Sequence, residues 1–274
     1  MKRAIYLIAY IILIITALSM LFPFFAMIIL AFTSNDAIFS NSNSLFSLKI
    51  TTENFNHVFS NLPITKYFFN SLFVALFTTL GQVSIASLAG FAFSRLNFKY
   101  KSFWFTVIII TMMVPPQVNI IPLFFLIKEL HLINTYFAMI LPGLFGGFGV
   151  FLMKQYFDSL PKELEDAAKI DGCNIFQIFF KVDLPLALPA CVTLAIFTFV
   201  TTWNSFMWPL IVTNTDSMRT LPVALAAFKG SFREITLWGD LLACSVVCTI
   251  PVILIFLAGK KYFLQNLLAG GVKE

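Results

Sequence analysis

Acidic side chains, which could act as general acids or bases, metal ligands or charged contacts for a partner, are concentrated in one part of the chain. The protein has 13 Asp and Glu residues. Six of them fall between Asp158 and Asp183, around the stretch KELEDAAKIDGCNIFQIFFKVDLPLALPA at 162–190. The residues between these acids indicate which of the three roles applies.

The first half of this stretch has the spacing of a helix with one face of small and apolar side chains. Members of that face fall at positions i, i+4, i+7, i+8 and i+11: Leu160, Leu164, Ala167, Ala168 and Asp171. We expect Ser159 to cap the helix, Pro161 to occupy its first turn and Gly172 to end it. The charged side chains are then more exposed: Lys162, Glu163, Asp166 and Lys169.

The second half predicts another short helix. Asn174 is expected to cap it, and Leu184-Pro185 to end it after Val182. A face of small side chains lets a helix sit deeply in a groove of a partner protein. An amphipathic hairpin resting on lipid is the alternative, but such helices usually carry an excess of Lys and Arg. The excess of acids here favours a docking surface for a protein.

The elements that position this hairpin are membrane spans. The chain is 59% hydrophobic and only 11% charged, whereas soluble domains carry about 25% charged residues. Apolar segments long enough to cross a bilayer predict an all-α membrane protein with six transmembrane helices. They lie near 4–32, 67–93, 103–127, 135–153, 187–212 and 240–259. The first apolar run is too long for a cleaved signal peptide, so we expect it to be retained.

The distribution of basic residues predicts the orientation. With the N-terminus inside, 12 of the 18 Lys and Arg residues lie in cytoplasmic segments and 6 in outer segments. Both termini and the loop at 154–185 are therefore expected in the cytoplasm. The scattered basic residues fit membrane topology better than nucleic-acid binding.

Several chemistries have no residues to support them. No span interior contains Asp, Glu, Lys, Arg or His, which disfavours a proton-driven carrier and an intramembrane enzyme. The sequence has no phosphate-binding loop, so energy for pumping must come from another chain. Gly143 and Gly147 are spaced for close helix packing, and Cys244 and Cys248 have no His or acid beside them to form a metal site.

The acidic stretch resembles the EAA loop of permease subunits in binding-protein-dependent ABC importers, with the pattern E-A-A-x3-G-x9-I-x-L-P. Asp166, Ala167 and Ala168 match E-A-A, and Gly172 matches the glycine. The end of the pattern is matched by Val182, Leu184 and Pro185. Asp for Glu and Val for Ile are conservative departures from this pattern.

Four further segments resemble the carbohydrate branch of that family, the maltose-type permeases. They are MMVPPQVNIIPLF (112–124), WNSFMWPLIV (203–212), RTLPVAL (219–225) and LLAGGVK (267–273). The resemblance implies that residues 1–274 form a single permease domain of a type I importer. It also implies a bacterial cytoplasmic membrane protein that transports a sugar or oligosaccharide.

The resemblance further implies the partners and the roles of particular residues. Two permease subunits, usually different, would form the pore above two ATPases, and a solute-binding protein would deliver cargo. This chain would bind no cofactor or metal and have no catalytic residue, since ATP and Mg would be acted on by the ATPase. Coupling to the ATPase would involve Glu165, Asp166, Ala167, Ala168, Asp171, Gly172, Val182, Leu184 and Pro185.

Candidate contacts for cargo are neutral polar and aromatic residues. Trp203, Asn204 and Trp208 have the chemistry that holds sugars, but Trp also anchors spans at the membrane interface. Gln117 and Asn119 lie beside Pro115-Pro116. Either they line the cargo path, or they form hydrogen bonds with backbone groups that the prolines leave without a helical partner. The polar segment 33–65 either meets the binding protein or is a solvated connection.

Two other transport functions remain open at this point. One is an ABC permease for another polar solute, such as a glycerol phosphate ester, although the spans offer no basic group for an anion. The other is a self-sufficient secondary carrier, in which the acidic loop would have no ATPase to bind.

Overall fold

The structure is a computed structural model that describes residues 2–39, 50–231 and 237–271. Regular structure in these ranges is helical, apart from one isolated bridge between Thr33 and Ile50. The chain divides into two units, Met1–Phe68 with Leu221–Pro251, and Phe69–Thr220 with Val252–Glu274. The prediction of an all-α fold is confirmed.

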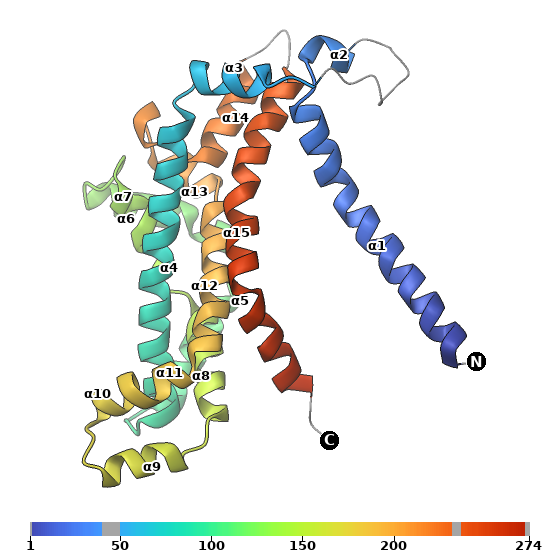
Figure 1. The fold of residues 1–274 in the computed structure, drawn as a ribbon. Coiled ribbons are helices and arrows are strands. Elements are labelled where there is room, and N and C mark those ends of the chain that lie inside the picture. Colours follow the sequence, from blue (N-terminus) through green and yellow to red (C-terminus); the bar gives the residue numbers. More distant parts are fainter. Residues whose placement is uncertain (1, 40–49, 232–236, 272–274) are drawn as a thin grey trace. The chain divides into compact units, whose positions relative to one another are not determined.

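Three helices are single apolar elements long enough to cross a membrane: α1 (Lys2–Ala31), α4 (Ile64–Arg95) and α15 (Trp238–Gly271) (Figure 1). Their apolar windows have mean hydropathies of 2.6, 1.8 and 2.8. Shorter helices complete the first unit: α2 (Asn35–Phe39), α3 (Glu53–Asn61) and α14 (Leu221–Ser231).

The segments predicted as the third, fourth and fifth spans are broken rather than continuous. The third consists of α5 (Lys101–Met113), a 3-10 turn (Pro116–Asn119) and α6 (Ile120–Glu129), with a bend of 94°. Pro115 and Pro116 cause this break, because proline cannot donate the helical hydrogen bond.

The fourth predicted span is bent by 43° and the fifth is interrupted. The fourth comprises α7 (Tyr136–Ile140), a 3-10 turn (Leu141–Gly143) and α8 (Gly147–Ser159). In the fifth, α12 (Leu188–Trp203) stops before α13 (Met207–Val212). The smaller elements of the second unit are α9 (Glu163–Ile170), α10 (Ile175–Ile178), a π-helical turn (Phe179–Asp183), α11 (Leu184–Leu186) and a 3-10 turn (Asp216–Met218).

The two glycines predicted to allow close packing do so against different helices. A Cβ on Gly143 would lie 2.6 Å from Thr78 Cγ2 of α4. A Cβ on Gly147 would lie 3.0 Å from the Ile108 carbonyl oxygen of α5. Larger side chains at either site would push these helices apart.

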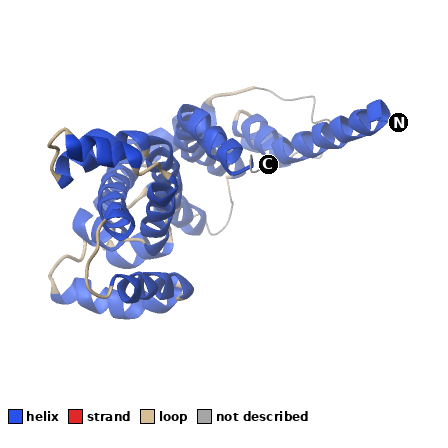
Figure 2. Ribbon diagram, turned by 90° about the horizontal axis from the view of Figure 1, so that it is seen from below, coloured by secondary structure: helices blue, strands red, loops and turns tan. Residues whose placement is uncertain are grey.

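A buried core joins α4, α8 and α12 in the second unit, and it extends into the acidic hairpin. Phe179 packs against Phe91 of α4 and Phe157 of α8, with ring centroids 5.1 and 6.5 Å away. α9 and α10 lie at one end of these helices (Figures 1 and 2). The core therefore holds one end of the hairpin in place.

Candidate coupling site

The predicted helix–glycine turn–helix is present at residues 163–183, but Leu184-Pro185 does not end its second helix. The π-helical turn runs directly into α11 (Leu184–Leu186), because proline is tolerated in the first turn of a helix. Gly172 adopts φ +79°, and a Cβ built on it would meet no atom within 4 Å. Asn174 caps α10, since its Oδ1 accepts from Gln177 N–H and Gln177 Oε1 accepts from Asn174 N–H, at 2.9 and 2.8 Å. Backbone conformation and capping together fix the reversal of the chain.

The beginning of α9 differs from the prediction. Ser159 is the last residue of α8, and its Oγ donates to the Tyr156 carbonyl at 2.6 Å. The N-cap is Lys162, which provides no side-chain cap. Helix α8 continues further than the sequence pattern indicated, and Pro161 therefore falls in the connection between the two helices.

Only part of the predicted apolar face of α9 is buried in the structure. Ala168 is buried, whereas Leu164 and Ala167 are exposed. Glu165 is 6% exposed and turns inward. Asp166 turns outward, and its Oδ1 accepts from Lys169 Nζ at 2.8 Å, which together with the Lys169 charge holds the pKa of this carboxyl below its usual range.

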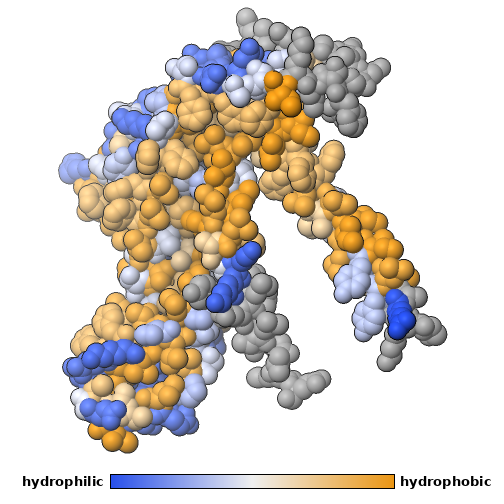
Figure 3. Space-filling model, in the orientation of Figure 1, coloured by the Kyte–Doolittle hydropathy of each residue, from blue (hydrophilic) through white to orange (hydrophobic). Residues whose placement is uncertain are grey.

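The outward surface of the hairpin combines exposed apolar and charged side chains. Ile170 is 87% exposed, and Phe176 and Phe180 are 68% and 58% exposed. Figure 3 shows hydrophilic and hydrophobic patches interspersed over this end of the protein. Hydrophobic side chains rimmed by charges are typical of a protein interaction surface.

The remaining predicted coupling residues follow the same division between buried and exposed positions. Asp171 is exposed at the C-cap of α9. Val182 and Leu184 are half-buried, and Pro185 is exposed. The structure thus places the predicted set in the hairpin and in α11, which follows it directly, with some members exposed and others facing the core.

A buried ion pair that the sequence did not indicate joins the hairpin to α4. Arg95 is the last residue of α4, and its Nε faces Glu165 Oε1. Their side chains are 3% and 8% exposed. Arg95 Nη2 also donates to the Leu160 carbonyl at 3.0 Å, so one guanidinium contacts both α9 and the end of α8.

A second acid lies in the same buried region. Asp183 is 1% exposed, and within the described residues its Oδ2 has no hydrogen-bond partner. Burial, reinforced by the Glu165 carboxylate, raises the pKa of Asp183 to about 6, although Arg95 and Lys169 oppose the shift. The hairpin therefore encloses two carboxyl groups and one guanidinium.

The candidate cargo residues are not brought together into one site. Trp203 is 2% exposed and stacks on Phe199 with ring centroids 5.7 Å apart. Asn204 is exposed, and its Nδ2 donates to the Val200 carbonyl at 2.9 Å. Gln117 and Asn119 are exposed in the 3-10 turn between α5 and α6.

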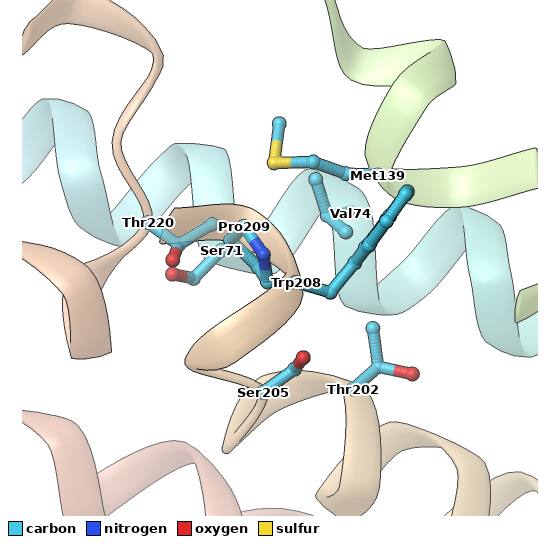
Figure 4. A pocket seen from close by; sticks show the side chains of 8 residues that line it. All are labelled: Ser71, Val74, Met139, Thr202, Ser205, Trp208, Pro209 and Thr220. Atoms are coloured by element: carbon cyan, nitrogen blue, oxygen red, sulfur yellow. The ribbon is translucent and has the colours of Figure 1, made fainter. Parts of the chain in front are cut away.

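Trp208 lines a small cavity in the second unit. Its Nε1 donates to the Ala138 carbonyl at 2.9 Å. Figure 4 shows the eight side chains that line it, four of which carry hydroxyls. The lining residues are Ser71, Val74, Met139, Thr202, Ser205, Trp208, Pro209 and Thr220. The volume is about 20 Å³, enough for roughly one water molecule. This cavity is too small to admit a sugar in the present conformation.

The first unit contains a polar cluster that the sequence also did not indicate. His57 Nδ1 pairs with Asp240 Oδ2, and Asp240 Oδ1 accepts from Asn35 at 3.3 Å. The buried Asn54 donates to the carbonyls of Ala31 and Thr33 at 2.8 and 2.7 Å. These bonds connect the end of α1, α3 and the start of α15.

The described chain combines long apolar helices, helix pairs broken at proline and an acidic hairpin that reverses at a glycine. Residues 82–269 match the family described as binding-protein-dependent transport system inner membrane component. The chain belongs to that family, which confirms the resemblance found in the sequence.

Named relatives agree with this membership. The arabinooligosaccharides transport system permease protein AraQ of Halalkalibacterium halodurans is 35% identical over 92% of this chain and 91% of its own. The trehalose/maltose transport system permease protein MalG of Thermococcus litoralis is 36% identical over 95% of this chain and 94% of its own. The sn-glycerol-3-phosphate transport system permease protein UgpE of Yersinia enterocolitica is 27% identical over 97% of each chain.

The fold also matches a solved structure. A chain of a bacterial ABC transporter involved in the import of the acidic polysaccharide alginate superposes with a TM-score of 0.84. The match covers 96% of this chain and 97% of that chain, at 24% sequence identity. It shows the shared permease fold.

Proposed function

We propose that this chain is a membrane-spanning permease subunit of an ATP-driven importer for a sugar or oligosaccharide. It forms half of the translocation pore with a second permease subunit. A solute-binding protein delivers the cargo, and a separate ATPase supplies the energy. The chain's own role is coupling and passage, with no bond made or broken.

The hairpin at 163–183 is the observation that carries this proposal. Its outward surface presents Asp166 and Ala167 beside exposed Ile170 and Phe176. Such a surface is suited to docking into a groove of a protein. An ATPase seated there would move the hairpin when ATP closes it, and the rigid helices would rock between two states.

Sugar as cargo is supported by the relatives and by the neutral lining near Trp208. AraQ and MalG are named for arabinooligosaccharides and for trehalose and maltose. Trp208 with the hydroxyls of Thr202 and Ser205 offers an aromatic face and neutral hydrogen-bonding groups. Since the cavity now has room for only about one water, the helices must separate before a sugar passes. Trp203, Asn204, Gln117 and Asn119 would meet cargo only along a wider path.

The orientation follows from the location of the hairpin. If the ATPase binds α9 and α10, then residues 154–185 face the cytoplasm. The basic residues then place both termini on the same side. ATP and Mg would be bound by the ATPase alone.

The test is purification of the tagged chain in mild detergent from its native cells, followed by reconstitution into liposomes. We expect an ATPase and a second permease to copurify, and uptake of sugar to require ATP and a solute-binding protein. Recovery of the chain alone, with ATP-independent uptake, would instead support a secondary carrier.

Another cargo class has a specific relative in its favour, the glycerol-3-phosphate permease UgpE. Comparing labelled oligosaccharide with labelled glycerol 3-phosphate in the same liposomes separates the two. The neutral lining near Trp208 predicts uptake of the sugar, whereas uptake of glycerol 3-phosphate alone would contradict the sugar assignment.

A further inference from the structure

The buried contact between Arg95 and the hairpin has a mechanical consequence. We propose that Arg95 is a positioning residue that fastens α9 to α4, so that displacement of the docked hairpin must move a membrane-spanning helix. This inference rests on the proposed function. It identifies the contact between α9 and α4 as the place where movement of the hairpin is transmitted to a membrane-spanning helix.

The geometry joins three elements through one side chain. Arg95 ends the 32-residue helix α4, faces Glu165 of α9 through Nε, and donates to the Leu160 carbonyl through Nη2. A guanidinium binds through several donors in a fixed planar arrangement, so it restricts orientation as well as distance. Movement of α9 alone would have to break the Glu165 contact, while the Leu160 bond keeps the guanidinium attached to the end of α8.

Neighbouring bonds strengthen the end of α4 at this point. Ser94 Oγ donates to Asp158 Oδ1 of α8 at 2.6 Å. Lys101 Nζ donates to the carbonyls of Ser94 and Leu96 at 3.2 and 2.9 Å. The last turn of α4 is therefore hydrogen-bonded to α8 and to Lys101 at the start of α5. A force applied at Arg95 acts on an ordered helix end.

The ring contacts between Phe179, Phe91 and Phe157 also join the hairpin to α4 and α8. Apolar contacts are not directional, so rings can slide while remaining buried. Arg95 adds a buried ion pair to Glu165 and a hydrogen bond to the Leu160 carbonyl, and the hydrogen bond is directional. A purely structural role for Arg95 would affect assembly, but it would leave the number of solutes moved per ATP unchanged.

Asp183 makes the inference more specific. It is buried, and it interacts electrostatically with both Arg95 and Glu165. When Glu165 is neutralised, Asp183 remains as a second buried carboxyl that the Arg95 charge attracts. Glu165→Gln should therefore weaken coupling less than Arg95→Met does, and Glu165→Gln with Asp183→Asn should match Arg95→Met.

The experiment uses the assembled transporter in liposomes and measures sugar uptake and ATP hydrolysis together. We expect Arg95→Met to retain ATP hydrolysis but to lower uptake per ATP by about tenfold or more, with Arg95→Lys intermediate. Lys99→Met is the matched control, because Lys99 is exposed nearby and contacts the Tyr100 ring at 4.9 Å. It removes the same charge and should leave the ratio unchanged.

Each outcome decides the inference. Unchanged uptake per ATP in Arg95→Met would overturn it, even with the importer function intact. If Arg95→Met fails to assemble, Arg95→Lys and Glu165→Gln decide instead, and wild-type ratios in both would overturn the inference. If the unaltered chain shows no ATP-dependent uptake, the proposed function itself is wrong.

Discussion

Gly172 is the residue at which the hairpin reverses, and its backbone conformation dictates which side chains can replace it. Its φ of +79° lies in the left-handed region, which costs residues with a side chain about 1–2 kcal/mol. A Cβ added at this position would meet no neighbouring atom. Substitution therefore strains the backbone without creating a collision. Any functional loss at this position reports on the turn itself.

We predict that Gly172→Val uncouples ATP hydrolysis from transport, because the strained turn would displace α10 relative to α9. Gly172→Asn should retain coupling, since Asn accepts the left-handed conformation far better than a β-branched residue. Uptake per ATP in liposomes is the measurement. Normal transport by Gly172→Val would show that the turn has no coupling role.

Asp183 gives the protein a pH dependence with a definite sign. Its pKa is raised by burial and by Glu165 to about 6, against the opposing charges of Arg95 and Lys169, whereas an unperturbed Asp has a pKa of about 4. The folded protein holds this proton more tightly than the unfolded chain. Stability contributed by the protonated group is therefore lost as the pH rises from about 4 through about 6.

We predict that Asp183→Asn removes this loss of folding stability with rising pH. Between pH 5 and pH 7, the melting temperature of the unaltered transporter should fall relative to that of the Asp183→Asn transporter. Thermal unfolding in detergent at several pH values measures the difference between the two. Parallel curves would indicate that Asp183 does not titrate in this range.

At the scale of elements, glycines allow α4 to approach its neighbours closely, and two sites on that helix permit a matched comparison. A Cβ on Gly90 would lie 2.8 Å from Lys154 N of α8, which is backbone. A Cβ on Gly81 would lie 2.3 Å from Leu144 Cδ2, the flexible end of a side chain. The first collision can be relieved only by moving a helix.

We therefore expect Gly90→Ala to lower the stability of the protein by about 1–3 kcal/mol, the usual effect of overpacking. Gly81→Ala should have a smaller effect, because the Leu144 side chain can rotate away. Melting temperatures of the two variants in the same detergent measure this. A larger loss in Gly81→Ala would show that the contact between α4 and α8 is not the tight one.

The hairpin was predictable from the sequence because its signals are local. Gly172 and Asn174 mark a helix end and a helix start within three residues, and the break at Pro115-Pro116 is likewise local. The partner of Glu165 was not predictable, since Arg95 lies 70 positions away at the end of another helix. The interruption between Trp203 and Met207 was not predicted, because Asn204 and Ser205 within it are uncharged and it contains no Gly or Pro.

At the scale of the molecule, the apolar surface of the helices requires lipid or other apolar partners. The most apolar window of α1 has no buried residue and a mean hydropathy of 2.6. In water this surface would be strongly unfavourable. Its burial must come from the bilayer or from other protein chains.

We predict that Leu13→Lys, in the middle of α1, reduces the amount of protein inserted in the membrane. A central Lys adds roughly 2.5–3.5 kcal/mol to the free energy of insertion. Ile170→Lys is the control, since Ile170 is 87% exposed on the hairpin and lies outside the predicted spans. Quantitative blotting of membrane fractions would compare them, and equal abundance would argue against a lipid environment for Leu13.

Photo-crosslinking is the most direct test of whether the hairpin couples the ATPase to transport. A photoreactive amino acid would replace Ile170 on the hairpin or, as the control, Leu130, which is 54% exposed beyond the other end of a predicted span. We expect an adduct between position 170 and the ATPase, identified by mass spectrometry, and none from position 130. An ATPase adduct from position 130 alone, or no adduct at 170 in an actively transporting complex, would contradict coupling through the hairpin.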